Sequence, residues 1–454
     1  MKRFSKENID ITNGNIKSTL IALSTPVIIS MALQTAFNII DAIFLGRLSA
    51  DALAAISITF PVIFFIIAIG AGIGIGVTSL IARYIGKNQI MDARQSATHG
   101  LILSAIISIV TTALGLYYIE QIFTFMGAET AVISLAKSYM TIIIYNFIII
   151  LTVFILNSIL HGEGDTLTPM KALVISVSLN IILDPILIFG YWIIPPLGIE
   201  GAAIATVISR LFGLLLILHH FIKKRAKVTP IIRGFNYLPK IIKNILKVGI
   251  PSSLSQISMS IAFFILTSFV AKFGTPAIAA FGAANKLQTI GILPSIAIAT
   301  AVITIVGQNA GLKKYDRIET TVKTAIKLLT TFMIPTAIIL ITFRNQFMTL
   351  FTDDKTVISL GSEFLKIVPI ELIFIPTGMI IASAFQGTGK GTPQLVLTMI
   401  RLFIFCIPIA YYLAFTKAMG LTGIWWSFVI AAAMTSIISL AWFKTGSWKK
   451  ETKI

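Results

Sequence analysis

The chain has 454 residues, of which 56% are hydrophobic and only 12% are charged, and its mean hydropathy is +0.93. Soluble domains carry about a quarter charged residues, so this composition argues against a soluble enzyme. Lys and Arg number 36 against 18 Asp and Glu, a formal charge of +18. Because apolar residues outnumber these charges so heavily, a globule that binds nucleic acid is excluded, and the basic excess is expected in loops.

The single cysteine and the N-terminal residues exclude two further classes. Cys406 cannot form an internal disulfide and offers no metal cluster, so neither a metal nor a cofactor is expected. Residues 1–17 are polar, and no short apolar core with a small-residue cleavage site follows them. We therefore expect no removable signal peptide, and the first helix is retained.

Long apolar segments dominate the rest of the chain. A bilayer crossing needs about 20 apolar residues, and the segments that meet this length lie at 18–45, 52–82, 94–118, 131–157, 168–190, 200–222, 244–271, 276–308, 320–343, 357–385, 394–415 and 420–444. They are continuous rather than alternating, and helices satisfy their own backbone polar groups in lipid. The sequence predicts an all-α polytopic membrane protein with about twelve transmembrane helices.

The distribution of Lys and Arg predicts the orientation. With twelve crossings, both termini share a side with the loops that follow every second helix, and most basic residues fall on that side, which is then cytoplasmic. The largest cluster, which we expect to lie against anionic lipid, consists of Lys223, Lys224, Arg225, Lys227, Arg233, Lys240, Lys243 and Lys247. We expect a multi-pass protein of the cell membrane.

An internal repeat divides the chain into halves. A shift of about 225 residues aligns Pro26 with Pro251, GVTSLIARYIG (76–86) with AVITIVGQNAG (301–311), and HGEGDTLTP (161–169) with QGTGKGTP (386–393). Because each half has an even number of helices, the copies share one orientation, as in transporters that work by alternating access. A membrane-embedded enzyme or scaffold is the alternative.

The repeat predicts two pseudo-symmetric six-helix lobes around a central cleft. The expected parts are a cytoplasmic N-terminal segment (1–17), an N-lobe (18–222), a basic cytoplasmic linker (223–243), a C-lobe (244–444) and a cytoplasmic tail (445–454).

Ionisable residues inside the helices are the candidates for function, because each costs about 3 kcal/mol or more in lipid. They are Asp41, Asp184, Arg210, Lys286, Glu371 and, near a helix end, Arg401. No HExxH, Walker loop or serine-triad context is present. Coupling to an ion gradient is therefore expected rather than hydrolysis.

Two polar stripes mark the N-lobe. Gln34, Asn38 and Asp41 are spaced i, i+4, i+7 and so share one helix face, on which Gln34 and Asn38 are expected to line a substrate cavity. Asn180 and Asp184 repeat the pattern on the fifth predicted helix. At about 1.5 Å per residue, both aspartates lie at the same depth, in the outer half of the membrane.

Tyr139 and Thr206 enter from the outside and reach about the level of the aspartates. Five oxygen-bearing groups from four helices are therefore expected to converge as a proton-coupling device or a cation cage. The alternative is a polar network that holds helices together, which two acids without a cation in the same lobe make costly. Asn157 is expected either to line the cavity or to join helices.

The C-lobe differs at the corresponding positions. The partner of Asp41 is Leu266, and that of Asp184 is Ile409 or its neighbour. The C-lobe instead carries Glu371 and Lys286 at a similar depth, and we expect an intramembrane ion pair between them. A Glu371 that contacts substrate is the alternative.

Two prolines are expected to mark helix starts. Pro26 and Pro251 lie near the first turns of the first and seventh predicted helices, where a missing N–H and a steric clash kink a helix. The kink at Pro26 is either structural or a movable bend.

At this point the chain resembles the multidrug and toxic compound extrusion (MATE) family, and specifically its DinF-like branch, over nearly its whole length. The matching pieces are LSTPVIISMALQTAFNIIDAIFLGRL, LAAISITFPV, LHGEGDTLTP, LNIILDPILIFG and GIEGAAIATVIS. The resemblance implies twelve helices in two lobes forming a V, and export of organic cations and other amphipathic compounds against a proton or sodium gradient. It maps the coupling aspartates of the family onto Asp41 and Asp184, with Tyr139, Asn180 and Thr206 as their neighbours.

The coupling ion follows from two comparisons. The family branch with a C-lobe sodium site has carboxylates on its seventh and tenth helices, whereas the seventh helix here offers only Ser252, Ser253, Ser255 and Gln256. In the N-lobe, sodium remains an alternative, with Asp184, Asn180, Thr206 and a carbonyl freed by Pro185 as ligands. Two aspartates at one depth repel each other when both are ionised, which favours protons.

The sequence therefore predicts a proton-coupled antiporter for cationic or amphipathic organic compounds, acting as a monomer among membrane lipids, with no cofactor besides the coupling ion. A lipid-linked oligosaccharide flippase of the same superfamily is an alternative. By resemblance, such flippases carry fourteen helices and a basic cleft, so the helix count and the acidic lobe favour the exporter.

Overall fold

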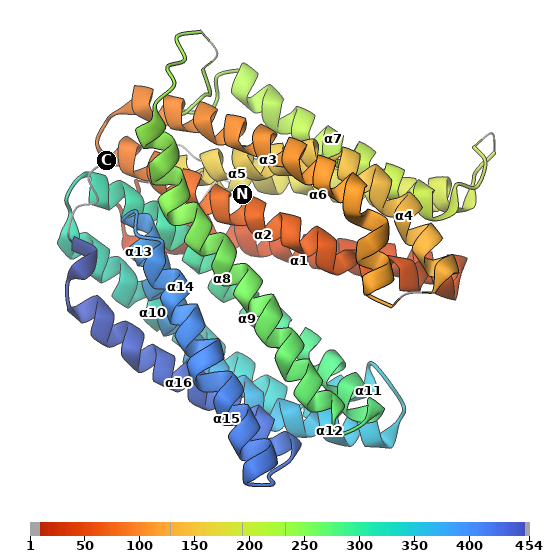
Figure 1. Ribbon diagram of the computed structural model, residues 1–454. Helices are drawn as coiled ribbons and strands as arrows, with labels where there is room; N and C mark the ends of the chain where they lie inside the picture. The colour runs from red at the N-terminus through yellow and green to blue at the C-terminus, as the bar shows by residue number, and fades with distance from the viewer. Residues whose placement is uncertain (1–9, 128, 193, 232, 450–454) are drawn as a thin grey trace. The chain divides into compact units, whose positions relative to one another are not determined.

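The computed structural model describes residues 10–127, 129–192, 194–231 and 233–449. Within these ranges nearly the whole chain is helical (Figure 1), apart from loops and an isolated bridge between Tyr191 and Ile194. Of the predicted terminal segments, residues 1–9 and 450–454 lie outside the described residues.

The helices of the first half are long. They are α1 (Ile16–Leu48), α2 (Ala50–Gly86), α3 (Ile90–Phe125), α4 (Thr130–Tyr145), α5 (Phe147–Glu163), α6 (Leu167–Phe189) and α7 (Gly198–Ile222). Those of the second half are α8 (Pro239–Ala271), α9 (Thr275–Gly311), α10 (Tyr315–Thr342), α11 (Arg344–Thr349), α12 (Lys355–Ile367), η3 (Val368–Ile373), α13 (Ile375–Gly387), α14 (Thr392–Met399), η4 (Ile400–Cys406), α15 (Ile407–Tyr411), η5 (Tyr412–Thr416), α16 (Leu421–Lys444) and η6 (Ser447–Lys449).

Ten described helices are long and apolar enough to cross a membrane, and the number is twelve when each of two bent pairs counts as one span. The predicted all-α polytopic fold is thus confirmed. The bend of 49° between α4 and α5 falls at Asn146, whose side chain donates to the carbonyl of Ile142 and replaces a helical bond. The 42° bend before α13 lies between Pro369 and Pro376, which have no N–H to donate.

The described chain forms two compact units, but it changes unit inside two helices rather than in the basic linker. Unit 1 contains residues 25–249, and unit 2 contains 10–24 together with 250–449. The expected boundaries at 222 and 244 therefore differ from the unit boundaries. The first turns of α1 belong to unit 2, and those of α8 belong to unit 1.

Packing explains why the start of α1 belongs to unit 2. Ile11, Leu20 and Leu23 are buried in one apolar cluster with residues of α9, α10 and α13. Arg317 donates to the carbonyls of Ile11 and Gly14, at 3.2 and 2.6 Å.

The linker is held in unit 1 by side chains of α3. The backbone N–H of Leu238 donates to Nε2 of His99 at 3.0 Å, and that of Ile231 donates to Oγ1 of Thr98 at 2.9 Å. The linker ends earlier than expected, because α8 already begins at Pro239.

Pro26 and Pro251 lie within their helices, so the expectation that they start them is wrong. The residues of α1 before Pro26 are helical and belong almost entirely to unit 2, whereas the rest of α1 belongs to unit 1. The residues of α8 before Pro251 belong almost entirely to unit 1, whereas the rest of α8 belongs to unit 2. Each proline follows directly after the point where the chain changes unit, at residues 24–25 and 249–250.

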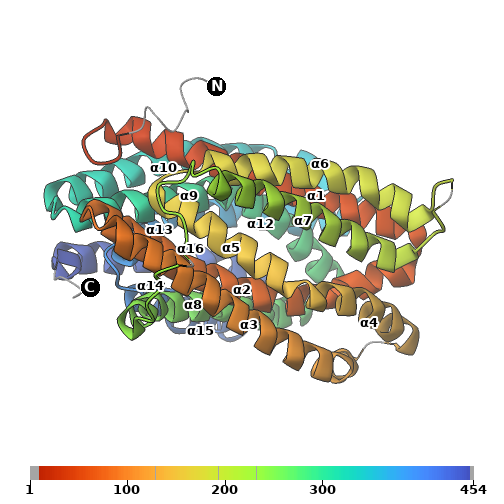
Figure 2. The same ribbon diagram turned by 90° about the horizontal axis from the view of Figure 1, so that it is seen from above.

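Helices α6 and α7 pack side by side in unit 1 (Figure 2). Gly201 allows this close approach, because a Cβ there would lie 2.3 Å from the carbonyl oxygen of Leu187. Further along, the hydroxyl of Ser176 donates to the carbonyl of Ser209 at 2.7 Å. These contacts set the register of the two helices that carry most of the candidate site.

Candidate ion-coupling site

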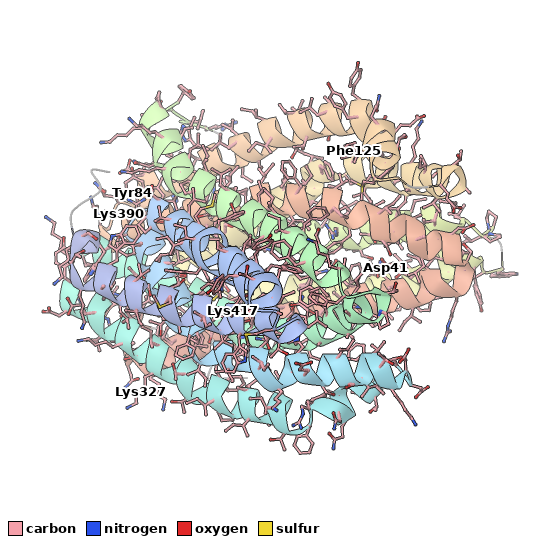
Figure 3. All side chains as sticks on the ribbon, turned by 60° about the horizontal axis from the view of Figure 1, so that its bottom comes forward. Asp41, Tyr84, Phe125, Lys327, Lys390 and Lys417 are labelled. Atoms are coloured by element: carbon pink, nitrogen blue, oxygen red, sulfur yellow. The ribbon has the colours of Figure 1, made fainter. Side chains whose placement is uncertain are left out.

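Five predicted polar residues lie buried in unit 1, on four different helices. Asp41 on α1 is labelled in Figure 3. The exposed fractions are 8% for Asp41, 6% for Tyr139 on α4, 1% for Asn180 and 0% for Asp184 on α6, and 5% for Thr206 on α7. Polar groups buried to this degree need partners or a ligand.

Electrostatic interactions show that the structure brings these groups together. The charge of Asp41 acts on Asp184 and on the Tyr139 hydroxyl, and that of Asp184 also acts on Tyr139. The predicted convergence of α1, α4 and α6 is therefore present. Thr206 belongs to α7, which packs on α6.

Asn180 and Asp184 form a pair one helical turn apart. The amide Nδ2 of Asn180 donates to Oδ1 of Asp184 at 3.0 Å. This hydrogen bond orients the carboxylate of Asp184 and leaves its Oδ2 atom able to bind a proton or a cation. Pro185 follows in the same helix and has no N–H, so the carbonyl of Ile181 lacks its helical donor.

Four buried oxygen atoms of this site accept no hydrogen bond from the described residues. They are Oδ1 of Asp41, Oδ1 of Asn180, Oδ2 of Asp184 and Oγ1 of Thr206. An unsatisfied buried acceptor costs about 1–3 kcal/mol, so these open acceptors on α1, α6 and α7 indicate a ligand site. Carboxylate, amide and hydroxyl oxygens suit a proton or a hard cation.

Arg210 is a site residue whose role the sequence reasoning missed. It lies one turn after Thr206 on the same face of α7. Its charge acts on Asp41 and on the Tyr139 hydroxyl. The expectation that no cation in this lobe compensates the two acids is therefore wrong, and the i, i+4 spacing from Thr206 was the available signal.

The residues expected in a substrate cavity are more exposed than the five buried residues of the site. Gln34 donates to Asn38 across one turn of α1 at 3.4 Å, and Asn38 is exposed. Asn157 on α5 is half-buried, and its Oδ1 accepts no hydrogen bond within the described chain.

The ion pair expected in the C-lobe is not formed. Glu371 is buried in the 3-10 segment η3, where it accepts a hydrogen bond from Nε2 of Gln288 at 3.0 Å. Lys286 is exposed, and in the described part of the chain no ion pair joins it to Glu371. Residues two apart on a helix point in nearly opposite directions, so α9 presents Gln288 rather than Lys286 to Glu371.

A known protein family matches both halves of the chain. The family described as MatE matches it twice, over residues 26–186 and 251–412. The two matches begin at Pro26 and Pro251, which confirms the internal repeat.

Relatives match almost the whole chain. A probable multidrug resistance protein of Bacillus subtilis is 26% identical over 434 residues, covering 94% of this chain and 93% of the relative. An FAD transporter of Shewanella oneidensis is 28% identical over 412 residues, covering 89% and 90%. A multidrug resistance MATE transporter of the MOP superfamily, solved in an outward-facing conformation, is 34% identical with a TM-score of 0.92, covering 98% and 99%.

Proposed function

Because the chain belongs to the MatE family of membrane transporters, we propose that it exports organic cations and other amphipathic compounds in exchange for protons. A multi-pass transporter of this kind is not an enzyme. The proposal includes a location in the cell membrane with both termini in the cytoplasm, where the basic residues of the linker and tails would lie. It also includes action as a monomer.

The observation that carries the proposal is the group of buried oxygens without donors around Asp41 and Asp184. A carboxyl removed from water favours its neutral, protonated form. Ionised, the pair attracts an organic cation. Protonated, it loses that attraction and releases the cation, so proton and substrate exclude each other, which is the requirement for antiport.

Pro26 is the proposed bend of α1. It lies next to the point where α1 passes from unit 2 to unit 1. Proline weakens the helical ladder there, so the part of α1 that carries Gln34, Asn38 and Asp41 can repack when the carboxyls change charge.

Sodium is the alternative coupling ion, with Asp184, Asn180, Thr206 and the carbonyl of Ile181 as ligands. The two neighbouring aspartates favour the proton, because they repel each other when both are ionised and protonation of one removes that repulsion. The count of up to twelve spans likewise favours an exporter over a flippase.

Purified protein in liposomes tests the proposal. We expect a pH gradient alone, with sodium-free buffer on both sides, to drive accumulation of a cationic dye. Transport that runs on a sodium gradient at symmetric pH, and stops with a proton gradient in sodium-free buffer, would make Asp184 a sodium ligand instead.

The substrate class needs its own arm of that experiment. One relative carries the name FAD transporter, so FAD is offered in parallel with the dye under the same pH gradient. Uptake of FAD without uptake of any organic cation would replace the proposed substrate class while leaving proton coupling intact.

A further inference from the structure

We propose that Arg210 is a resident counter-cation for Asp41, so that the site has one exchangeable negative charge and each cycle exchanges one proton for one monovalent organic cation. This inference rests on the proposed function and adds to it the coupling ratio and the charge class of the substrate.

Arg210 is held at the site by its own helix. It lies on α7 one turn beyond Thr206, and α7 is fixed against α6 by the close contact at Gly201 and by the bond from Ser176 to Ser209. An arginine cannot lose its charge in a protein. A guanidinium among membrane helices therefore needs a compensating negative charge.

The two aspartates have different surroundings. The charge of Arg210 acts on Asp41 and on the Tyr139 hydroxyl. Asp184 is instead surrounded by the carboxylate of Asp41 and the amide of Asn180. Arg210 therefore compensates Asp41, and Asp184 carries the uncompensated charge.

Arg210 and Asp41 interact without a direct ion pair, and Oδ1 of Asp41 accepts no hydrogen bond in the described chain. The guanidinium thus reduces the net negative charge of the site but donates no hydrogen bond to Oδ1 of Asp41. Asp41 remains able to contact a proton or a substrate cation alongside Asp184.

The charge balance follows from these three groups. With both carboxyls ionised, Arg210 leaves a net charge of minus one, which matches one monovalent cation. One proton makes the site neutral, so the cation is no longer held. A second proton would leave an uncompensated guanidinium among buried groups, which is costly. Removal of Arg210 would leave a charge of minus two and call for two protons or a dication.

The coupling ratio is measured in liposomes with the membrane potential clamped at zero by potassium and valinomycin. At equilibrium, a 10-fold proton gradient sustains about a 10-fold gradient of a monovalent cation if one proton is exchanged, and about a 100-fold gradient if two are. We expect about 10-fold for a monovalent cation with the native chain and with R210K. R210M, whose site would carry minus two, should instead exchange a dication for two protons and sustain about a 100-fold gradient of the dication. K286M removes an exposed intramembrane cation from unit 2 and serves as the matched control, with the native ratio.

A double variant tests the assignment of Arg210 to Asp41. In D41N, Asp184 and Arg210 cancel, so binding of a monovalent cation is lost. In D41N/R210M, Asp184 alone restores one negative charge, and we expect cation binding and a ratio of one proton to return. Proton release on cation binding in detergent, one per cation for the native chain, gives a second readout that also applies to R210Q if R210M does not fold.

The inference is overturned if neither R210M nor R210Q exchanges a dication for two protons, or if the native chain itself exchanges two protons for one monovalent cation. A native chain that shows no proton-driven transport in sodium-free buffer would instead overturn the proposed function. The two failures are thereby distinguished in the same liposomes.

Discussion

The candidate ion-coupling site of unit 1 is polar, whereas the equivalent positions of the second repeat in unit 2 are apolar. With the offset between the two family matches, Asp41, Tyr139 and Thr206 correspond to Leu266, Phe364 and Ala431. These three are each 1% exposed and belong to one apolar cluster. The same helix positions thus hold a polar group with open acceptors in one unit and a filled core in the other.

Aromatic side chains complete the core of unit 2. The rings of Phe281 and Trp425 stack with centroids 5.6 Å apart, and those of Phe364 and Trp425 meet edge to face at 4.9 Å. Such pairs add about 0.5–1.5 kcal/mol each beyond the area they bury. The fold therefore does not require polar groups at these positions, and the cost of those in unit 1 indicates function.

The largest effect is expected from neutralising the aspartates of unit 1. Asp184→Asn and Asp41→Asn keep volume and hydrogen bonding but cannot be ionised, so each should lower proton-driven export by at least about 10-fold while the protein still folds and inserts. Dye uptake into liposomes, with circular dichroism as the folding control, measures this. Normal export by both single variants would remove the coupling role from unit 1.

The next largest effect concerns the stability of unit 2. Phe364→Ala opens a cavity in the aromatic cluster and should lower the free energy of unfolding by about 3–5 kcal/mol. The control at the equivalent position, Tyr139→Phe, should change stability by less than about 1 kcal/mol but reduce export, because it removes only a hydroxyl. Thermal unfolding in detergent reports the difference, and equal losses would show that both places are structural.

A smaller effect is expected at Glu371. Oε1 of Gln288 is buried and accepts no hydrogen bond from the described residues, and Oε1 of Glu371 accepts a hydrogen bond from the Gln288 amide. Glu371→Gln would let the two amides bond reciprocally but would remove the charge that acts on Arg401, so the two effects oppose each other. Stability should therefore change by less than about 1 kcal/mol, with export changed less than about twofold. A loss of proton-driven export as large as that of Asp184→Asn would show that Glu371 takes part in transport.

The smallest effect is expected at Lys286. Because its side chain is exposed and does not meet Glu371, Lys286→Met should change neither stability nor export beyond about 0.5 kcal/mol or twofold. A clear loss of export would show that Lys286 meets a carboxylate in another conformation of the transporter.

Much of the fold followed from local patterns in the sequence. Apolar length predicted the spans, because a helix must cross a fixed thickness of hydrocarbon. The rarity of charges in lipid singled out Asp41 and Asp184. The i, i+4 spacing predicted that Asn180 and Asp184 share a helix face, and the structure shows a hydrogen bond between them there.

Only the tertiary structure decided the rotation of each helix about its axis and the points where packing partners change. The interaction of the Arg210 charge with Asp41, and the bond of Glu371 to Gln288 rather than to Lys286, depend on contacts between helices far apart in sequence. The passage of α1 and α8 between units at their prolines depends on which unit buries the preceding turns. A local pattern encodes that a face is polar or apolar, but the neighbour that meets that face is set by the packing of the whole unit.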